Sequence, residues 1–290
     1  MDLLKLKNII FILFFASQSH AAALRDSRGK TIETKADGSI VSGFVGADEI
    51  LFHLMSEDKN RLLALSPLAK DKRYSAIYQE AKSWKKSFGL ELESLLALKP
   101  DLVILARYSR AEWIKMLDQV GVKSFVLGQF KDLSDIRQNI LNLGQLVHKE
   151  KEAKILLNSF DKNLAKVQKD CGGHGKTIVN YSEDGLVYGR NTSFDALINH
   201  IGLSNAGSKM GVEGWAKVSR ENMLLMKPDY IIIAGERKDI DKRHKEMMGQ
   251  VAWKNLRAVK EKKIIAVPSR YLSSVSHYIV KAMEGICAQL

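Results

Sequence analysis

The sequence predicts an α/β protein made of two Rossmann-like lobes that are joined by one long helix. Three observations predict this fold class. Short aliphatic runs alternate with amphipathic helical runs in both halves, a pattern typical of parallel β-α-β units. A helical pattern without proline fills residues 132–170 between the halves. Finally, GLELESLLALKPDLVIL at 89–105 and GWAKVSRENMLLMKPDYIII at 214–233 repeat one helix, turn and strand, so the two halves are expected to share one design.

The first 21 residues have the layout of a secretory signal peptide. Lys5 and Lys7 precede an apolar run at residues 9–16, and small residues surround Ala21, near which we expect cleavage. The apolar run is shorter than the ~20 residues that a membrane-spanning helix needs. The segment holds no cysteine that could carry a lipid anchor. The sequence therefore predicts an exported protein that is not a lipoprotein.

The composition is that of a globular protein with a basic surface. Hydrophobic residues make up 46% of the 290 residues, and 45 Lys and Arg against 33 Asp and Glu give a net charge of +12. A basic surface can favour anionic ligands, membrane surfaces or nucleic acid. Export and the scattered positions of the lysines argue against nucleic acid, so we interpret the charge as a solvated surface.

The N-terminal lobe is expected over residues 38–131. Residues 22–37 are polar and lack hydrophobic periodicity, so they are predicted to be a flexible lead-in. Strands are then expected where aliphatic residues cluster and helices where they recur at helical spacing. The predicted strands are 39–44, 61–66, 101–106 and 123–128, and the predicted helices are 47–55, 93–99 and 110–121.

The linking helix is expected over residues 132–170, where apolar residues recur at helical spacing and one long helix or two abutting helices would fit. A helix of ~35 residues would span roughly 50 Å, the length of a connecting rod rather than of a domain. The C-terminal lobe is then expected over residues 171–290. Its predicted strands are 177–182, 229–234 and 263–268, and its predicted helices are 193–202, 219–226, 244–256 and 278–290.

These motifs together resemble a known protein family. The phrase E-x-x-L-x-L-K-P-D-L-V-I, the acidic residues Asp48 and Glu49 before Ile-Leu, the mid-chain helix and the later W-x-x-V-S-R-E-x-x-L resemble periplasmic solute-binding proteins of ABC importers for iron complexes and cobalamin. The resemblance covers residues 38–290. It implies a periplasmic protein with two lobes bridged by a rigid helix, a ligand cleft between the lobes, small closure on binding, and no enzymatic step.

The resemblance also implies partners. Such proteins deliver their ligand to a permease dimer with ATPase subunits, making peripheral contact with this inner-membrane complex, and one exposed glutamate on each lobe meets permease arginines. By motif position these glutamates are Glu93 and Glu221. Each stands where a helix should begin, with Ser219 as a plausible N-cap, and the helix dipole favours a carboxylate there by ~0.3–1 kcal/mol. The chain itself is expected to be a monomer.

Ligand-binding side chains are expected where strands of the two lobes end, because parallel α/β sheets bind ligands at the carboxyl ends of their strands. Aromatic and arginine side chains gather at these positions and suit a large, partly anionic metal chelate through stacking and cation–π contacts. The predicted ligand-binding residues are Arg73, Tyr74, Arg107, Tyr108, Tyr188, Trp215, Arg270 and Tyr271.

No intrinsic cofactor or directly bound metal is predicted. The seven histidines form no H-x-H or H-x-x-x-H pair, and the two cysteines, Cys171 and Cys287, form no cluster. In an oxidising compartment these cysteines could form a disulfide, which their number alone does not decide. The favoured ligand is a ferric siderophore, because Arg73, Arg107, Arg237 and Arg270 could offset an anionic chelate, and a corrinoid is the close second.

Three rival functions remain open at this point. The chain could be an exported haem carrier of the same fold, with Tyr74 or Tyr108 as iron ligand. It could be an enzyme that processes chelates or metal clusters on a related two-lobe fold, which would need histidine or cysteine ligands between the lobes. It could also be an exported sensor that presents its ligand to a membrane receptor, and for this role Glu93 and Glu221 would matter equally.

Overall fold

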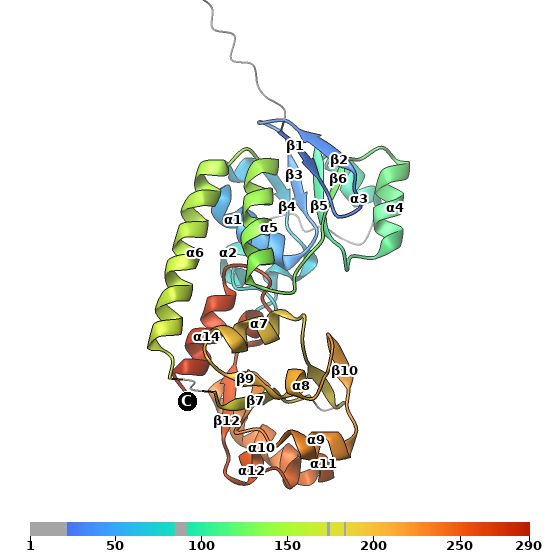
Figure 1. Cartoon of the computed structure of the whole chain (residues 1–290). Helices are drawn as coiled ribbons and strands as arrows, with labels where there is room; N and C mark the ends of the chain where they lie inside the picture. Colours follow the sequence, from blue (N-terminus) through green and yellow to red (C-terminus); the bar gives the residue numbers. More distant parts are fainter. Residues whose placement is uncertain (1–21, 85–91, 173–174, 183) are drawn as a thin grey trace, which may run out of the picture.

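The computed structural model describes residues 22–84, 92–172, 175–182 and 184–290. It contains two α/β lobes stacked end to end, with helix α6 (Glu150–Asp170) running along one side from the first lobe to the second (Figure 1). The two-lobe fold predicted from the sequence is therefore confirmed. The predicted signal peptide and its cleavage site near Ala21 lie outside the described residues.

The first lobe is built on a four-stranded parallel sheet in the order β4-β3-β5-β6. Its strands are almost wholly buried and aliphatic, as sheets covered on both faces require. The strands are β3 (Ile40–Ser42), β4 (Leu62–Ala64), β5 (Leu102–Ala106) and β6 (Ser124–Leu127). The helices are α1 (Val45–Leu54), α2 (Tyr78–Ala81), α3 (Leu92–Ala97), α4 (Ala111–Gln119) and α5 (Leu133–Leu146).

The second lobe repeats this sheet topology in the order β12-β11-β7-β9. In each lobe the first strand of the sheet lies between the second and the third, and the fourth pairs with the third. The strands are β7 (Thr177–Asn180), β9 (Ser204–Asn205), β11 (Tyr230–Ala234) and β12 (Ile264–Val267), and a separate antiparallel ribbon consists of β8 (Leu186–Tyr188) and β10 (Trp215–Lys217). The helices are α7 (Ser193–His200), α8 (Ala206–Lys209), α9 (Arg220–Met226), α10 (Ile240–Gly249), α11 (Val251–Lys254), α12 (Arg257–Lys260), α13 (Ser269–Leu272) and α14 (Ile279–Cys287).

The repeated Lys-Pro-Asp segment makes the same turn in both lobes. Lys99 and Lys227 both adopt left-handed backbone conformations, with φ of 49° and 40°. Asp101 then accepts hydrogen bonds from the backbone N–H and the hydroxyl of Ser39, each at 2.8 Å. Asp229 accepts the same pair from Thr177, at 2.8 and 2.9 Å. The aspartate thus ties the third strand of each sheet to the start of the first.

Residues 132–170 form two abutting helices, which is one of the two arrangements that the sequence left open. Asp132 caps α5, and a turn at residues 147–149 separates α5 from α6; His148 there has φ of 57°. The two helices pack closely, since a methyl group on Gly144 would lie only 2.3 Å from the Ala153 Cβ. Helix α5 therefore packs mainly on the first lobe, and α6 is the helix that runs from the first lobe to the second.

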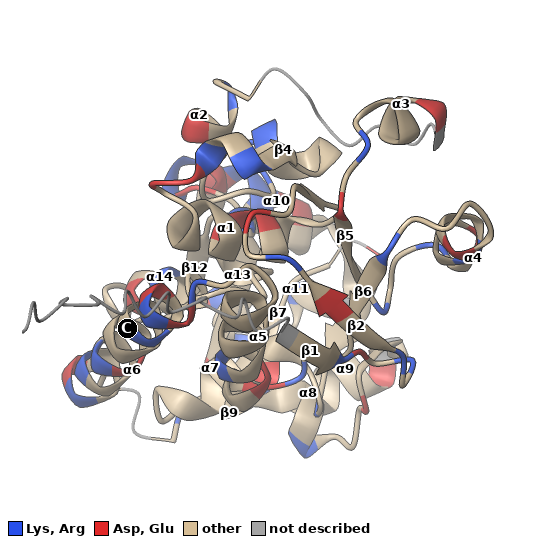
Figure 2. Ribbon diagram, turned by 90° about the horizontal axis from the view of Figure 1, so that it is seen from above, with Lys and Arg blue, Asp and Glu red and all other residues tan. Residues whose placement is uncertain are grey.

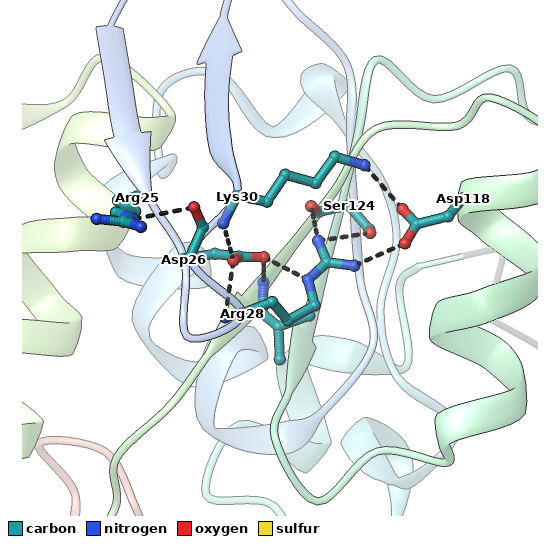
Figure 3. Close-up of polar contacts among 8 residues, drawn as sticks. Arg25, Asp26, Arg28, Lys30, Asp118 and Ser124 are labelled. Atoms are coloured by element: carbon teal, nitrogen blue, oxygen red, sulfur yellow. Dashed lines mark hydrogen bonds and ion pairs between the residues drawn. The ribbon is translucent and has the colours of Figure 1, made fainter.

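The predicted flexible lead-in is instead an ordered hairpin, formed by β1 (Ala22–Arg25) and β2 (Thr31–Thr34). Arg28 anchors it: its guanidinium bonds Asp26 at 2.6 Å, the Ser124 carbonyl at 2.7 Å and Asp118 at 3.2 Å (Figure 3). Ile32 is buried in the main core. The prediction failed because hydrogen bonds and ion pairs between polar groups, rather than an apolar stripe, hold most of this segment in place.

One hydrophobic core joins the two lobes along the side that carries α6. Leu156 and Phe160 of α6 belong to the same buried cluster as Leu51 of α1 and Leu197 and Ile279 of the second lobe. Two further cores, one on the opposite face of each sheet, stay within a single lobe. The shared core and α6 together fix how the lobes sit relative to each other.

A disulfide joins Cys171, at the end of α6, to Cys287, at the end of α14. This answers the question that the cysteine count left open. The bond fastens the bridging helix to the last helix of the second lobe. Within the residues that the structure covers, none of the helices combines the length and apolar character needed to cross a bilayer.

Candidate functional site

A cavity of about 570 Å³ lies at the carboxyl edge of the first sheet, where a segment of the second lobe closes it. This volume falls in the ordinary range of small-molecule sites. The first lobe contributes the loops that follow its first three strands, and the second lobe contributes residues between α13 and α14. The lining residues are Gly43, Phe44, Val45, Gly46, Glu49, Ser66, Pro67, Leu68, Tyr74, Leu105, Tyr108, Ser109, Arg110, Trp113, Ser273, Ser274 and Val275.

Aromatic side chains form much of the cavity wall. Tyr108 is 63% exposed and Tyr74 is 46% exposed, so both rings are available to a ligand. Phe44 supports Tyr108 with an edge-to-face contact, their ring centroids 5.9 Å apart, and Phe130 lies 5.3 Å from Tyr108. A wall of exposed aromatic rings backed by buried ones suits a ligand with a flat apolar face.

Helix α1 carries two adjacent buried carboxyls beside the cavity, Asp48 and Glu49. Asp48 is fully buried and accepts hydrogen bonds from the backbone N–H of Ser66, at 3.0 Å, and from its hydroxyl. Burial raises the pKa of Asp48 from 3.8 to about 7, although these hydrogen bonds oppose the shift. Asp48 therefore joins α1 to the loop after β4 and stays within the first lobe.

Glu49 lines the cavity itself and contacts both lobes. Its carboxyl accepts a hydrogen bond from the Ala76 N–H at 2.7 Å, and others from the hydroxyls of Ser274, at 3.4 Å, and Ser276. Burial is the largest cause that raises the pKa of Glu49 from 4.5 to about 7, and the negative charge of Asp48 adds to it. The hydrogen bonds from Ser276 and Ala76 act in the opposite direction.

Among the predicted ligand-binding residues, only Tyr74 and Tyr108 line the cavity. Three of the predicted arginines are engaged or placed elsewhere. Arg73 pairs with Asp71 at 2.7 Å, and Arg107 lines a separate polar cavity beside the N-terminal hairpin. Arg270 lies 3.5 Å from Glu236 and donates to the Lys72 carbonyl at 3.3 Å.

The remaining predicted residues belong to the second lobe and lie outside the cavity lining. Tyr188 and Trp215 pair across the β8–β10 ribbon, where Trp215 is 70% exposed. Tyr271 lies beneath the Arg270 guanidinium, 4.7 Å from the ring centroid. Arg237, one of the four arginines expected to offset the charge of an anionic chelate, donates to the Ala288 carbonyl at 3.4 Å.

Several cavity residues were missed from the sequence. Ser273, Ser274 and Val275 follow no strand, so the rule that ligands meet strand ends could not find them. Glu49 carried a usable signal, because two acids inside an otherwise apolar helical stripe are costly to bury without a purpose. Metal ligation gains no support, since no group of three potential His, Cys, Asp or Glu ligands occurs among the described residues.

The expected docking glutamates lie at the starts of corresponding helices. Glu93 is in the first turn of α3 and Glu221 in the first turn of α9, and both are exposed. Ser219 caps α9 by accepting a hydrogen bond from the Asn222 N–H at 3.2 Å, as predicted. Helices α3 and α9 lie in different lobes, on the side away from α6 (Figure 1). Along α6 itself, positively and negatively charged residues are interspersed (Figure 2).

The comparison with known families is decisive for the class of protein. A model described as periplasmic binding protein matches residues 40–271. The chain belongs to the periplasmic binding protein family. The match omits the N-terminal hairpin and the whole of α14, and it includes both sheets and every residue that lines the cavity except the last three, Ser273–Val275.

Individual relatives within this periplasmic family carry different ligands in their names. The chain is 27% identical over 223 residues to a vitamin B12-binding protein of Salmonella paratyphi A, a match covering 73% of this chain and 76% of the relative. It is 23% identical over 202 residues to a molybdate-binding protein of Haemophilus influenzae, covering 62% of this chain but only 56% of the relative. A periplasmic haem-binding protein of Roseiflexus shares the fold, with a TM-score of 0.73 at 19% identity over 87% of this chain and 97% of that one.

Proposed function

We propose that the protein is the substrate-binding component of an ABC importer, which captures a metal chelate in the cavity and delivers it to a membrane permease. The observation that carries this proposal is the aromatic-walled cavity at the seam of two lobes, within a chain of the periplasmic binding protein family. A carrier needs a binding site that both lobes complete, and it needs no groups that react with the ligand. The cavity meets the first condition.

The character of the cavity favours a corrinoid over a ferric siderophore. The expectation of an anionic chelate depended on four arginines, and none of them lines the cavity. Among the residues that the structure describes, Glu49 and Arg110 are its only charged members, so an anionic ligand would gain little from the wall. A large, nearly neutral macrocycle with amide groups would instead use the tyrosine rings and the serine hydroxyls.

Calorimetric titration of the mature protein with cyanocobalamin, hemin, a ferric hydroxamate siderophore and molybdate tests the ligand class. We expect cyanocobalamin to bind most tightly. Replacing both Tyr74 and Tyr108 with alanine should weaken binding by at least about tenfold, as expected for the loss of two stacking contacts. The matched control is Arg107→Ala, outside the cavity, which should leave affinity unchanged. Tightest binding of the siderophore, weakened by Arg107→Ala, would contradict the assignment.

Delivery to the permease is proposed to use Glu93 and Glu221. Each carboxylate would pair with a permease arginine through charge-assisted hydrogen bonds. Exposed pairs of this kind contribute up to about 1 kcal/mol each, which suits a carrier that must dissociate again. The double variant Glu93→Ala/Glu221→Ala should abolish uptake in whole cells and leave calorimetric affinity intact. Glu112→Ala, in the first turn of α4, is the matched control, and equal loss of uptake there would refute the docking roles.

A further inference from the structure

A segment of the second lobe crosses to the first lobe and closes the cavity. It comprises residues 273–278, between α13 and α14, and is called the crossing segment below. In Figure 1 the red chain that precedes α14 rises to the lower side of the first lobe. Ser273, Ser274 and Val275 form part of the cavity wall. The shape of the ligand site therefore depends on what holds this segment in place.

Glu49 holds the crossing segment through its carboxyl group. One oxygen accepts the Ala76 N–H at 2.7 Å, and the other accepts the hydroxyls of Ser276 and of Ser274, the latter at 3.4 Å. The side chain is almost completely buried. A single carboxyl thus connects α1, the loop that carries Tyr74, and the second lobe.

Packing around this contact is close enough to make the fit sensitive. A methyl group on Gly46, one turn before Glu49, would lie 2.6 Å from the Val275 Cγ2. Arg270 adds a second contact between the lobes by donating to the Lys72 carbonyl at 3.3 Å. The crossing segment therefore seats against α1 only in a narrow range of positions, and Glu49 supplies its most buried polar contact.

We propose that Glu49 is a positioning residue for ligand binding: by holding the crossing segment against α1 it completes the cavity, and it makes ligand affinity rise as pH falls. This inference rests on the proposed function only in taking the cavity as the ligand site. Glu49 need not touch the ligand. It acts through the position of the segment that does.

The direction of the pH effect follows from the two states of the carboxyl. While the segment is held, burial keeps the pKa of Glu49 at about 7. Once the segment detaches, water reaches the carboxyl and its pKa returns toward 4.5. The held form therefore binds a proton more tightly, and falling pH favours it. With these pKa values Glu49 alone favours the held form by about tenfold more at pH 6 than at pH 8.

Other titratable groups near Glu49 do not produce this effect. They are Asp48 and His53 on α1, Tyr78 and Glu80 on α2, Tyr108 after β5, and Arg270, Tyr271, His277 and Tyr278 from the second lobe. Burial lowers the pKa of His277 to about 3 while the segment is held, and detachment would return it toward 6.5, so the titration of His277 between pH 8 and 6 favours the detached form and opposes Glu49. Burial raises the pKa of Tyr278 to about 12. Asp48 titrates in the same range, but its hydrogen-bond partner Ser66 is in the first lobe.

Cyanocobalamin is the probe for the first test, because it carries no group that titrates between pH 6 and 8. Its affinity for the mature protein should increase by about two- to threefold from pH 8 to pH 6, the net of Glu49 and the opposing His277. Glu49→Gln keeps the size and an acceptor oxygen but cannot titrate, so only His277 remains to titrate in the contact and the affinity should fall from pH 8 to pH 6. Ser274→Ala/Ser276→Ala should weaken binding about tenfold at pH 6.

Asp48→Asn is the matched control, since it removes the neighbouring buried carboxyl without touching the crossing segment. It should keep the pH dependence of affinity and shift its midpoint to lower pH, because the charge of Asp48 contributes to the raised pKa of Glu49. Equal pH dependence in the wild type and Glu49→Gln would overturn the proposal, as would its loss in Asp48→Asn alone.

A second measurement does not depend on any ligand, so it separates this proposal from the proposed function. Hydrogen exchange of the unliganded protein, corrected for the intrinsic rate at each pH, should show residues 273–278 and the Ala76 amide more protected at pH 6 than at pH 8. Glu49→Gln should reverse the difference, because only His277 of the contact then titrates in this range. Unchanged protection across this range in the wild type would overturn the role of Glu49 even if a ligand binds. Failure of every probe to bind, with the exchange result as expected, would overturn only the ligand assignment.

Discussion

The two lobes share one scaffold but use their first helices differently. Both sheets have the same strand order, and the Lys-Pro-Asp turn makes the same hydrogen bonds in each. In the first lobe, helix α1 carries Asp48 and Glu49, and Glu49 reaches across to the second lobe. In the second lobe, helix α7 carries Asp195, which accepts hydrogen bonds from Asn205 and Ser208 of its own lobe.

This difference shows which features the sequence repeat preserves in both lobes and which features belong to one lobe only. The repeated residues hold strands together and place Glu93 and Glu221 at matching helix starts. The ligand cavity instead depends on residues without a counterpart in the other lobe, on α1 and in the crossing segment. The internal repeat of this chain therefore marks its scaffold and the two exposed glutamates rather than its cavity.

The largest expected effect concerns how each lobe is attached to α6. The first lobe contacts α6 through hydrophobic packing, whereas the second is also joined to it by the Cys171–Cys287 disulfide. Replacing both cysteines with serine should lower the free energy of unfolding in urea by about 2–5 kcal/mol. Reduction of the wild type should have the same effect. An unchanged urea midpoint after verified reduction would show that packing alone suffices in both lobes.

The first lobe should supply a large part of the pH dependence of stability, through Asp48. Asp48 has a pKa of about 7 when folded and 3.8 as its reference value, so the folded state holds more protons between these values. Its contribution is therefore complete below pH 4 and is lost as pH rises to 7. Asp48→Asn should make the urea stability fall less from pH 5 to pH 8, by on the order of 2–3 kcal/mol. Parallel curves for variant and wild type would contradict the burial of this charge.

The equivalence of the two Lys-Pro-Asp turns can be tested directly. Hydrogen bonds to Ser39 and Thr177 hold the pKa of both carboxyls below the ordinary range. Asp101→Ala and Asp229→Ala should each lower the free energy of unfolding by about 1–3 kcal/mol, by equal amounts, and the double variant should show the sum because the sites are far apart. A loss confined to one lobe would show that the repeat is similar in sequence only.

The smallest effect expected is a gain in stability at the left-handed lysines. Glycine adopts positive φ without the steric cost that Lys99 and Lys227 bear. Lys99→Gly and Lys227→Gly should each raise the free energy of unfolding by about 0.5–1 kcal/mol, measured in urea. Lys245→Gly, inside helix α10, is the control and should lower it by about 1 kcal/mol. Destabilisation in one lobe only would indicate that its lysine has a further contact.

Much of the fold could be predicted because it depends on local patterns. Buried aliphatic strands, amphipathic helices and the repeated turn each leave a signal within a few residues, and Tyr74 and Tyr108 were found because they follow strands. The parts that failed depend on distant partners. Asp118 and Ser124 order the N-terminal hairpin, and the crossing segment meets Glu49 across more than 200 positions of the chain.

The predicted arginines lie outside the cavity for a related reason. A charged side chain at a strand end can bind a ligand or pair with a nearby acid, and sequence alone does not distinguish the two. Arg73 and Arg270 pair with Asp71 and Glu236, so their charge is already balanced. Counting charged residues in the sequence therefore favoured an anionic ligand, whereas the wall of the cavity does not favour one.

Hydrogen exchange of the mature protein with and without saturating cyanocobalamin tests the central claim most directly, because it locates the bound ligand on the chain. Bound ligand should protect residues 43–49, 66–74 and 105–113 of the first lobe together with residues 273–275 of the second. Protection confined to the β8–β10 ribbon, or to the polar cavity around Arg107, would contradict the account.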